Sequence, residues 1–251
     1  MNSMEFDCSA KTCTVVFIGG DAPEPEEAKP FFEQIKGIDS VIAADSGLDT
    51  LRKYHSFFEN SGLDFSPDYV IGDMDSLLNR ELLDKFSGAK KEFYPRDKDF
   101  TDTELALMKA HSLYAKGESF IVLVGGNGGR ADHFIGILDT FSFDYRADCW
   151  LCGLQAVFFL GQGMGLKSFG LKKSQYVSVA RTSSSFEGGN IVTSGLEWKP
   201  DAGRKKGMPS LSNRIHDEKE GTASFYAKEG DFLVFLPLDA GFDFCRNSCF
   251  D

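Results

Sequence analysis

The sequence predicts an α/β domain built on a parallel sheet, followed by an all-β domain of the β-sandwich type. Up to about residue 145, short apolar runs alternate with segments in which apolar residues recur at helical spacing, as in parallel strands connected by helices. Beyond that point the helical spacing disappears, and short apolar runs are separated by Gly, Ser and Pro. The chain has 251 residues, 42% of them hydrophobic, which permits one large domain or two small ones.

In the first half, most of the expected strands are apolar runs that end at Gly, Asp or Pro. These strands are expected over residues 13–18, 40–44, 69–71, 92–94, 120–124 and 147–152. Helices are expected over residues 28–35, 48–58, 77–86, 101–115 and 131–143. A parallel sheet covered on both faces by helices follows from this alternation.

The second half is expected to contain strands only. They are expected over residues 155–160, 175–180, 190–193, 222–227 and 232–236. The glycine-rich segment 161–165 is the expected boundary, so we predict an α/β domain over residues 1–163 and a β-sandwich domain over residues 164–251.

Composition and charge narrow the classes of partner. The formal net charge is −11, and Arg204, Lys205 and Lys206 form the only local basic cluster, so nucleic acid and anionic membranes are excluded as main partners. No hydrophobic stretch reaches the length of a membrane span. The N-terminal residues carry Glu5 and Asp7 and lack the apolar core of a signal peptide, so we expect a cytoplasmic protein.

Six cysteines occur, and Cys149 and Cys152 have the C-x-x-C spacing of redox and zinc sites. Both lie in an expected strand, where residues three apart face opposite sides, so their sulfur atoms should not converge. We expect reduced and mostly buried thiols; the alternative for the cysteines near the termini, Cys8, Cys13, Cys245 and Cys249, is a disulfide or a metal clip.

An expected buried strand over residues 69–71 is followed by Gly72 and by two carboxylates, Asp73 and Asp75. In extended backbone this spacing places both side chains on one side, beyond the carboxyl end of a parallel strand, where ligands bind in such sheets. Paired carboxylates suit Mg²⁺. The alternative is a solvated loop that caps the next helix. Asp45 ends the preceding strand and is either a third carboxylate at this edge or a helix cap.

The segment 97–104 is expected to open a helix. Thr101 and Glu104 have the spacing of a capping box, which accounts for them without a ligand. Asp102 should project from the first turn of the helix, and Lys98 beside it could meet a phosphate group. Together these groups suit a metal-bound polyphosphate.

The segment 125–133 links a strand to a helix and is rich in glycine. Gly126, Gly128 and Gly129 would let backbone N–H groups approach phosphate oxygens, and Arg130 would add a bidentate donor. A flexible turn is the alternative. The dinucleotide-binding fingerprint is not completed, because no acidic residue closes the following strand.

In the second half, Trp198 is either a core residue or a stacking platform for a flat or cationic ring.

These motifs together resemble thiamine pyrophosphokinases. The motifs that carry the resemblance are AADSG with Asp45, IGDMDS with Asp73 and Asp75, KDFTD with Thr101 and Asp102, the stretch Gly129 to His133 with Arg130 and Asp132, and the later SGLEW and LSN segments. The resemblance implies a parallel α/β catalytic domain followed by a thiamine-binding β-sandwich. It also implies the transfer of pyrophosphate from ATP to thiamine with Mg²⁺, in a homodimer. The chain departs from the family at Ser46, at Ala131 and in its polar segment 199–209.

The resemblance also assigns roles to individual residues. Metal and pyrophosphate binding fall to Asp45, Asp73, Asp75 and Asp102. Phosphate binding falls to Thr101 and to the loop of Gly126, Gly128, Gly129 and Arg130, with Asp132 orienting the substrate. Thiamine binding falls to Trp198, Ser212 and Asn213. Two alternatives stay open, which are another Mg²⁺-dependent nucleotide phosphotransferase and a non-catalytic sensor of nucleotide or thiamine.

Overall fold

The computed structural model describes residues 12–74, 77, 80–114, 119–183, 188–199, 210–217 and 221–246. They divide into two units. The first, the α/β unit, comprises the described residues of 12–29 and Ile35–Leu154, and the second, the β unit, comprises Pro30–Gln34 and the described residues from Gln155 onward. Each unit is described by itself.

The α/β unit contains a parallel sheet. Its strands are β1 (Thr12–Phe17), β2 (Gly37–Ala44), β3 (Tyr69–Gly72), β4 (Lys90–Phe93), β5 (Phe120–Val124) and β6 (Cys149–Cys152). Their spatial order is β6-β5-β1-β2-β3-β4, and all neighbours are parallel. The chain therefore builds outward from β1 to β4 and then returns to the other side of β1. The predicted parallel sheet is confirmed.

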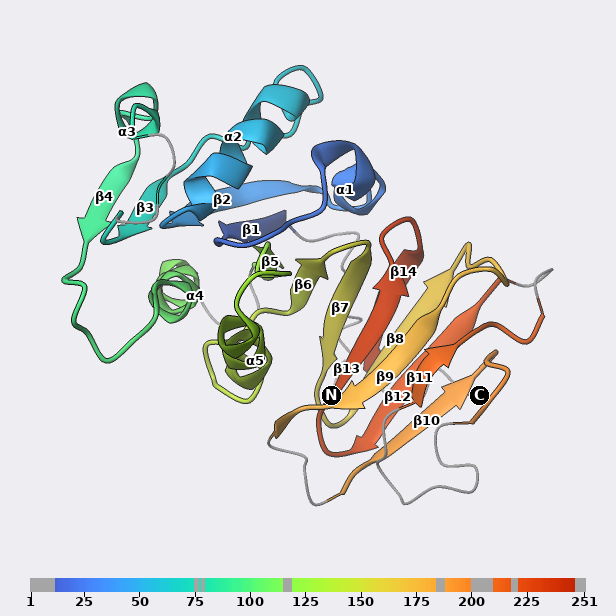
Figure 1. The fold of residues 1–251 in the computed structure, drawn as a ribbon. Helices are drawn as coiled ribbons and strands as arrows, with labels where there is room; N and C mark the ends of the chain where they lie inside the picture. The colour runs from blue at the N-terminus through green and yellow to red at the C-terminus, as the bar shows by residue number, and fades with distance from the viewer. Residues whose placement is uncertain are drawn as a thin grey trace. The chain divides into compact units, whose positions relative to one another are not determined.

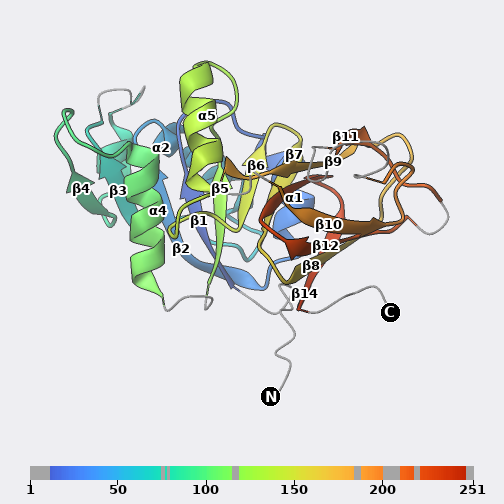
Figure 2. The ribbon, with the colours of Figure 1, turned by 90° about the horizontal axis from the view of Figure 1, so that it is seen from below.

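Helices cover both faces of this sheet. They are α2 (Gly47–Phe58), α3 (Leu82–Lys85), α4 (Asp102–Leu113) and α5 (Ala131–Thr140). Figures 1 and 2 show α2 and α3 on one face and α4 and α5 on the other. Because both faces are covered, β5 is buried over its whole length and β1 from its second residue, as their apolar sequences require.

The β unit contains two antiparallel sheets. Its strands are β7 (Gln155–Leu160), β8 (Met164–Phe169), β9 (Val177–Arg181), β10 (Asn190–Ser194), β11 (Ser210–Asn213), β12 (Ala223–Glu229), β13 (Phe232–Pro237) and β14 (Gly241–Arg246). One sheet has the order β11-β9-β13-β7 and the other β10-β12-β8-β14. Phe158 of β7 packs on Phe242 of β14 with ring centres 4.7 Å apart, so the two sheets pack face to face as in a sandwich.

The predicted division between residues 163 and 164 is corrected by the structure, in which the division follows Leu154. The reason is β7, which pairs antiparallel with β13 along its whole length and therefore belongs to the β unit. The helix α1 (Pro25–Phe32) also crosses the division, since its last three residues belong to the β unit.

Several elements differ from the sequence prediction. Strands β8, β11 and β14 were not predicted, and the predicted loop 161–165 already enters β8 at Met164. Helix α1 begins at Pro25 instead of residue 28, because proline is well suited to the first turn of a helix. Helix α3 is limited to Leu82–Lys85 among the described residues.

The cysteine prediction is confirmed for three residues and wrong for one. Cys13, Cys149 and Cys152 are reduced, whereas Cys245 is in a disulfide bond. Of the helices in the described part of the chain, none has the length and apolar character that crossing a membrane demands.

Candidate active site

A cleft of ≈ 850 Å³ opens at the carboxyl ends of the parallel strands in the α/β unit. Residues that follow β1, β2, β3 and β5 line it, together with the connection from β4 to α4. The strand order reverses between β1 and β5. Ligands bind outside the carboxyl ends of strands at such a reversal, so the topology alone makes this cleft the candidate site.

Three of the predicted carboxylates meet in this cleft. Asp45 follows β2, Asp73 follows β3 and Asp102 begins α4, and each offers a carboxylate oxygen within 4.8 Å of the other two. The backbone N–H of Asp45 donates to the carbonyl oxygen of Ile71 at 2.9 Å, which ties the ends of β2 and β3 together. Asp75 lies outside the described residues, so its role stays a prediction.

Gly72 makes this convergence sterically possible. Its φ is +132°, and a Cβ atom at this position would lie 3.1 Å from Oδ1 of Asp102. A side chain here would press against the carboxylate and strain the backbone. The glycine that ends β3 therefore lets α4 bring Asp102 up to the strand ends.

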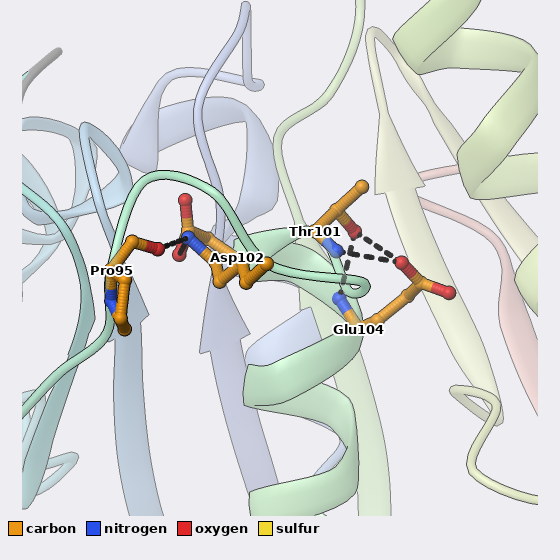
Figure 3. A network of polar contacts seen from close by, with 5 residues as sticks. Pro95, Thr101, Asp102 and Glu104 are labelled. Atoms are coloured by element: carbon orange, nitrogen blue, oxygen red, sulfur yellow. Dashed lines mark hydrogen bonds and ion pairs between the residues drawn. The ribbon is translucent and has the colours of Figure 1, made fainter.

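Opposing influences act on the charge of Asp102 in this cluster. Burial is the main cause that raises the pKa of Asp102, and the charges of Asp45 and Asp73 raise it further. Lys98 acts in the opposite direction, with Nζ 3.0 Å from Oδ1 of Asp102 and 3.3 Å from the carbonyl oxygen of Pro95 (Figure 3). Three carboxylate oxygens at this spacing are a donor set that can hold a hard divalent cation.

The start of α4 is fixed by the predicted capping box. The Glu104 N–H donates to Oγ1 of Thr101 at 3.2 Å, and the Thr101 N–H and hydroxyl both donate to the Glu104 carboxylate at 2.8 Å (Figure 3). These bonds hold the first turn of α4, and with it Asp102, in place. Because the hydroxyl of Thr101 is engaged in the cap, its predicted phosphate contact stays a prediction.

The glycine loop after β5 is clasped to the loop after β1. The Gly126 N–H donates to the carbonyl oxygen of Gly19 at 2.9 Å, and Asp21 and Asn127 exchange two backbone hydrogen bonds of 2.6 and 3.0 Å. Gly128 has a φ of +70°, and a Cβ there would lie 2.2 Å from Oδ2 of Asp21. The backbone of the glycine loop is therefore tied to the loop after β1, and its contact with phosphate stays a prediction.

Trp150 supports this loop from β6. Its Nε1 donates to the carbonyl oxygen of Gly125 at 2.7 Å, and its buried ring lies 5.4 Å from the ring of Phe134 on α5. No sequence pattern predicts this bond, because the apolar surroundings of Trp150 in the sequence indicate only that the residue is buried.

Arg130 and Asp132 form a bidentate ion pair at the edge of the cleft. The Arg130 guanidinium donates from Nη2 and Nε to the Asp132 carboxylate at 2.5 and 3.2 Å. The pair raises the pKa of Arg130 and lowers that of Asp132. Both side chains are exposed, so Arg130 can exchange this carboxylate for another anion at little cost.

Sixteen of the residues that line the cleft were not predicted as site residues. Four of them with larger or charged side chains are Arg96, Phe100, Asp139 and Phe143. Arg96 lies two positions before Lys98 and could have been found as a second cation of the same connection. Phe143 follows the end of α5, where the sequence shows no motif, so only the fold reveals its place.

The three residues predicted to bind thiamine all lie in the β unit. Trp198 is 51% exposed, so the alternative of a core tryptophan is wrong. Asn213 is 1% exposed, and its amide accepts from the Trp198 N–H at 3.2 Å and donates to the Trp198 carbonyl at 2.6 Å. Ser212 has a φ of +56°, and its N–H donates to Oγ of Ser178. Their contact with thiamine stays a prediction.

Comparisons with known proteins agree with this geometry. Residues 32–150 match the family model described as thiamin pyrophosphokinase, catalytic domain. No curated protein matches the chain significantly. The fold resembles a thiamin pyrophosphokinase family protein from Enterococcus faecalis (TM-score 0.64, 18% identity, covering 90% of this chain and 99% of that one). It also resembles thiamine pyrophosphokinase from Bacillus subtilis (TM-score 0.63, 19% identity, covering 90% of this chain and 99% of that one). A third similar structure is thiamin pyrophosphokinase from Candida albicans (TM-score 0.61, 15% identity, covering 91% of this chain and 93% of that one).

The matched segment contains Asp45, Asp73, Asp102 and the glycine loop, whereas Trp198 and Asn213 lie beyond it. The structural likenesses, at these low identities, show that the fold is shared over nine-tenths of the chain. Sequence match and fold agree: residues 32–150 match the thiamin pyrophosphokinase catalytic domain, and the fold resembles that of solved thiamin pyrophosphokinases.

Proposed function

We propose that the protein transfers the pyrophosphoryl group of ATP to the hydroxyl group of thiamine, which gives thiamine diphosphate and AMP. The observation that supports this most directly is the convergence of Asp45, Asp73 and Asp102 in one cleft with the glycine loop. The match to the family's catalytic domain spans all of these residues.

Asp45, Asp73 and Asp102 would hold Mg²⁺, with Asp75 as a further predicted ligand. These residues fit a hard divalent cation chemically. Three carboxylate oxygens within 4.8 Å of one another are hard donors that repel each other unless a cation lies between them. When bound, the cation would offset the negative charge of the triphosphate.

The chain's own residues would position the two substrates. The glycine loop, which is hydrogen-bonded to the loop after β1, would present backbone N–H groups to phosphate oxygens, and Arg130 and Lys98 would add positive charge. The thiamine oxygen would attack the β-phosphorus in line as the bond from this phosphorus to the bridging oxygen breaks. AMP would leave with that oxygen, and the hydroxyl proton would pass to a carboxylate of the cluster. Positioning and charge neutralisation would supply most of the rate.

Trp198, held by Asn213, would bind the thiazolium ring of thiamine through its exposed indole face. One further part of the proposal, a homodimer as the working assembly, rests on the sequence resemblance alone. A cytoplasmic location stays the expectation drawn from the sequence.

Product analysis tests the proposal. The protein is incubated with ATP, Mg²⁺ and thiamine, and the products are separated by ion-exchange chromatography. AMP and thiamine diphosphate in equal amounts are expected. ADP with thiamine monophosphate would instead indicate ordinary kinase chemistry, and thiamine binding without any turnover would indicate a sensor.

A further inference from the structure

The ring of Trp198 already has a cation against it. The guanidinium carbon of Arg214 lies 5.5 Å from the centre of the Trp198 ring and 5.9 Å from the centre of the Tyr176 ring. Tyr176 is 56% exposed, so this cluster of one cation and two rings lies at the surface of the β unit. A guanidinium at this distance is attracted by the negative face of an aromatic ring.

Trp198 and Arg214 are held by their backbones, not by their side chains. Asn213 binds both backbone polar groups of Trp198, and the Glu197 N–H donates to the carbonyl oxygen of Arg214 at 2.8 Å. Asn213 also accepts from the N–H of Arg214 at 2.9 Å. The backbone positions are therefore fixed, whereas the long Arg214 side chain has several rotatable bonds through which its guanidinium can move.

The hydrogen bonding of Arg214 is incomplete in this position. Its Nε is buried and has no hydrogen-bond acceptor within the described part of the chain. The nearby acid Glu197, next to Trp198 in the sequence, accepts from His216 at 3.2 Å. A buried N–H without an acceptor is unfavourable, so the hydrogen-bonding cost of this position has to be offset by other contacts, such as those with the two rings.

We propose that Arg214 occupies the ring-binding face of Trp198 and that a ligand ring must displace it. The inference rests on the proposed function, in which Trp198 holds the thiazolium ring of thiamine. The binding free energy of an incoming ring is then only the difference between two contributions, namely its own contact with the indole and the contact that Arg214 loses. Arg214 thereby sets the affinity of the pocket without being a catalytic residue.

The test compares the full-length parent with Arg214→Gln. Lys167→Gln is the matched control, because Lys167 is an exposed cation on β8 of the other sheet. Thiamine and its uncharged ring fragment 4-methyl-5-(2-hydroxyethyl)thiazole are titrated against tryptophan fluorescence. The signal of the buried Trp150, measured in Trp198→Phe, is subtracted. Arg214→Gln should bind both rings about two- to five-fold more tightly, the strength of an exposed cation–aromatic contact, and Lys167→Gln should bind as the parent does.

Quenching by ions locates the guanidinium without any ligand. Iodide should quench Trp198 better than caesium in the parent, and Arg214→Gln should lose this preference while Lys167→Gln keeps it. Unchanged or weaker binding of thiamine to Arg214→Gln would overturn the proposal, as would tighter binding of the charged ring alone, which would indicate repulsion instead of occupancy. Failure of thiamine to quench Trp198 in the parent and in Arg214→Gln would instead refute the thiamine pocket of the proposed function.

Discussion

Replacing Asp102 by asparagine tests whether the three carboxylates form a cation site. Asp102 is repelled by Asp45 and Asp73, whose oxygens lie within 4.8 Å, and attracted by Lys98 at 3.0 Å. With effective dielectric constants of about 80 to 20, Coulomb's law gives roughly 1–3 kcal/mol of repulsion for each carboxylate and about 1–5 kcal/mol of attraction for Lys98. These contributions nearly cancel, and burial then disfavours the charged carboxylate.

We therefore expect cation-free Asp102→Asn protein to be at least as stable as the parent, and at most about 1 kcal/mol more stable, which raises Tm by roughly 2–4 °C for a chain of this size. Mg²⁺ should stabilise the parent against heat and should lose most of this effect in the variant. Differential scanning calorimetry with and without Mg²⁺, at constant ionic strength, measures both quantities.

Asp139→Asn is the control, because Asp139 lines the same cleft outside the carboxylate cluster. It should keep the Mg²⁺-dependent rise in Tm. The reasoning is refuted if Asp102→Asn unfolds with a loss of more than about 2 kcal/mol while its response to Mg²⁺ stays intact, since a loss of that size is typical of a buried structural residue.

Four further predictions follow from single contacts. Asp73→Asn should abolish AMP formation without lowering Tm, and substantial turnover at any Mg²⁺ concentration would contradict the metal assignment. Trp198→Ala should raise the KM for thiamine strongly and that for ATP little, with Trp198→Phe in between; because the ring is half exposed, a collapse of Tm is not expected and would indicate a structural role. Gly128→Ala should cost about 1–3 kcal/mol in urea unfolding, because its φ is +70° and its Cβ would meet Asp21; an unchanged midpoint would show that the loop adapts. Burial raises the pKa of Cys152 to about 11, so iodoacetamide should modify this thiol slowly at pH 8 and faster as the pH rises towards 11, whereas rapid modification at pH 8 would contradict the burial.

The sequence predicts best those elements whose pattern is purely local. Strands β5 and β7 have the predicted bounds, since each is a continuous apolar run between polar residues or glycine. Strand β8 was missed because its sequence MGLKSF contains glycine and lysine and is buried at only three positions, so neither continuous hydrophobicity nor strict alternation marks it.

In the candidate site, too, contacts that follow from local patterns could be predicted and the others could not. The meeting of Asp45, Asp73 and Asp102 could be predicted, because each follows a strand or opens a helix and parallel strands end at a common edge. The pairing of Arg130 with Asp132 depends on the conformations of the two side chains. The hydrogen bonds between Asn213 and Trp198 join segments that are distant in sequence. No local pattern encodes these contacts, so the structure was needed to find them.

The course of α1 has a consequence for any attempt to divide the protein. Although most of the β unit begins at Gln155, it also takes residues 30–34 from the start of the chain. Phe31 stacks on Phe242 at 5.4 Å and lies 6.3 Å from Phe158, and the amide of Gln34 bonds to the backbone of residues 240 and 242. A gene fragment that starts at codon 155 would therefore encode a sandwich with an open gap in its core, and a chimaera made by a single crossover between relatives would pair Phe31 of one parent with Phe158 of the other.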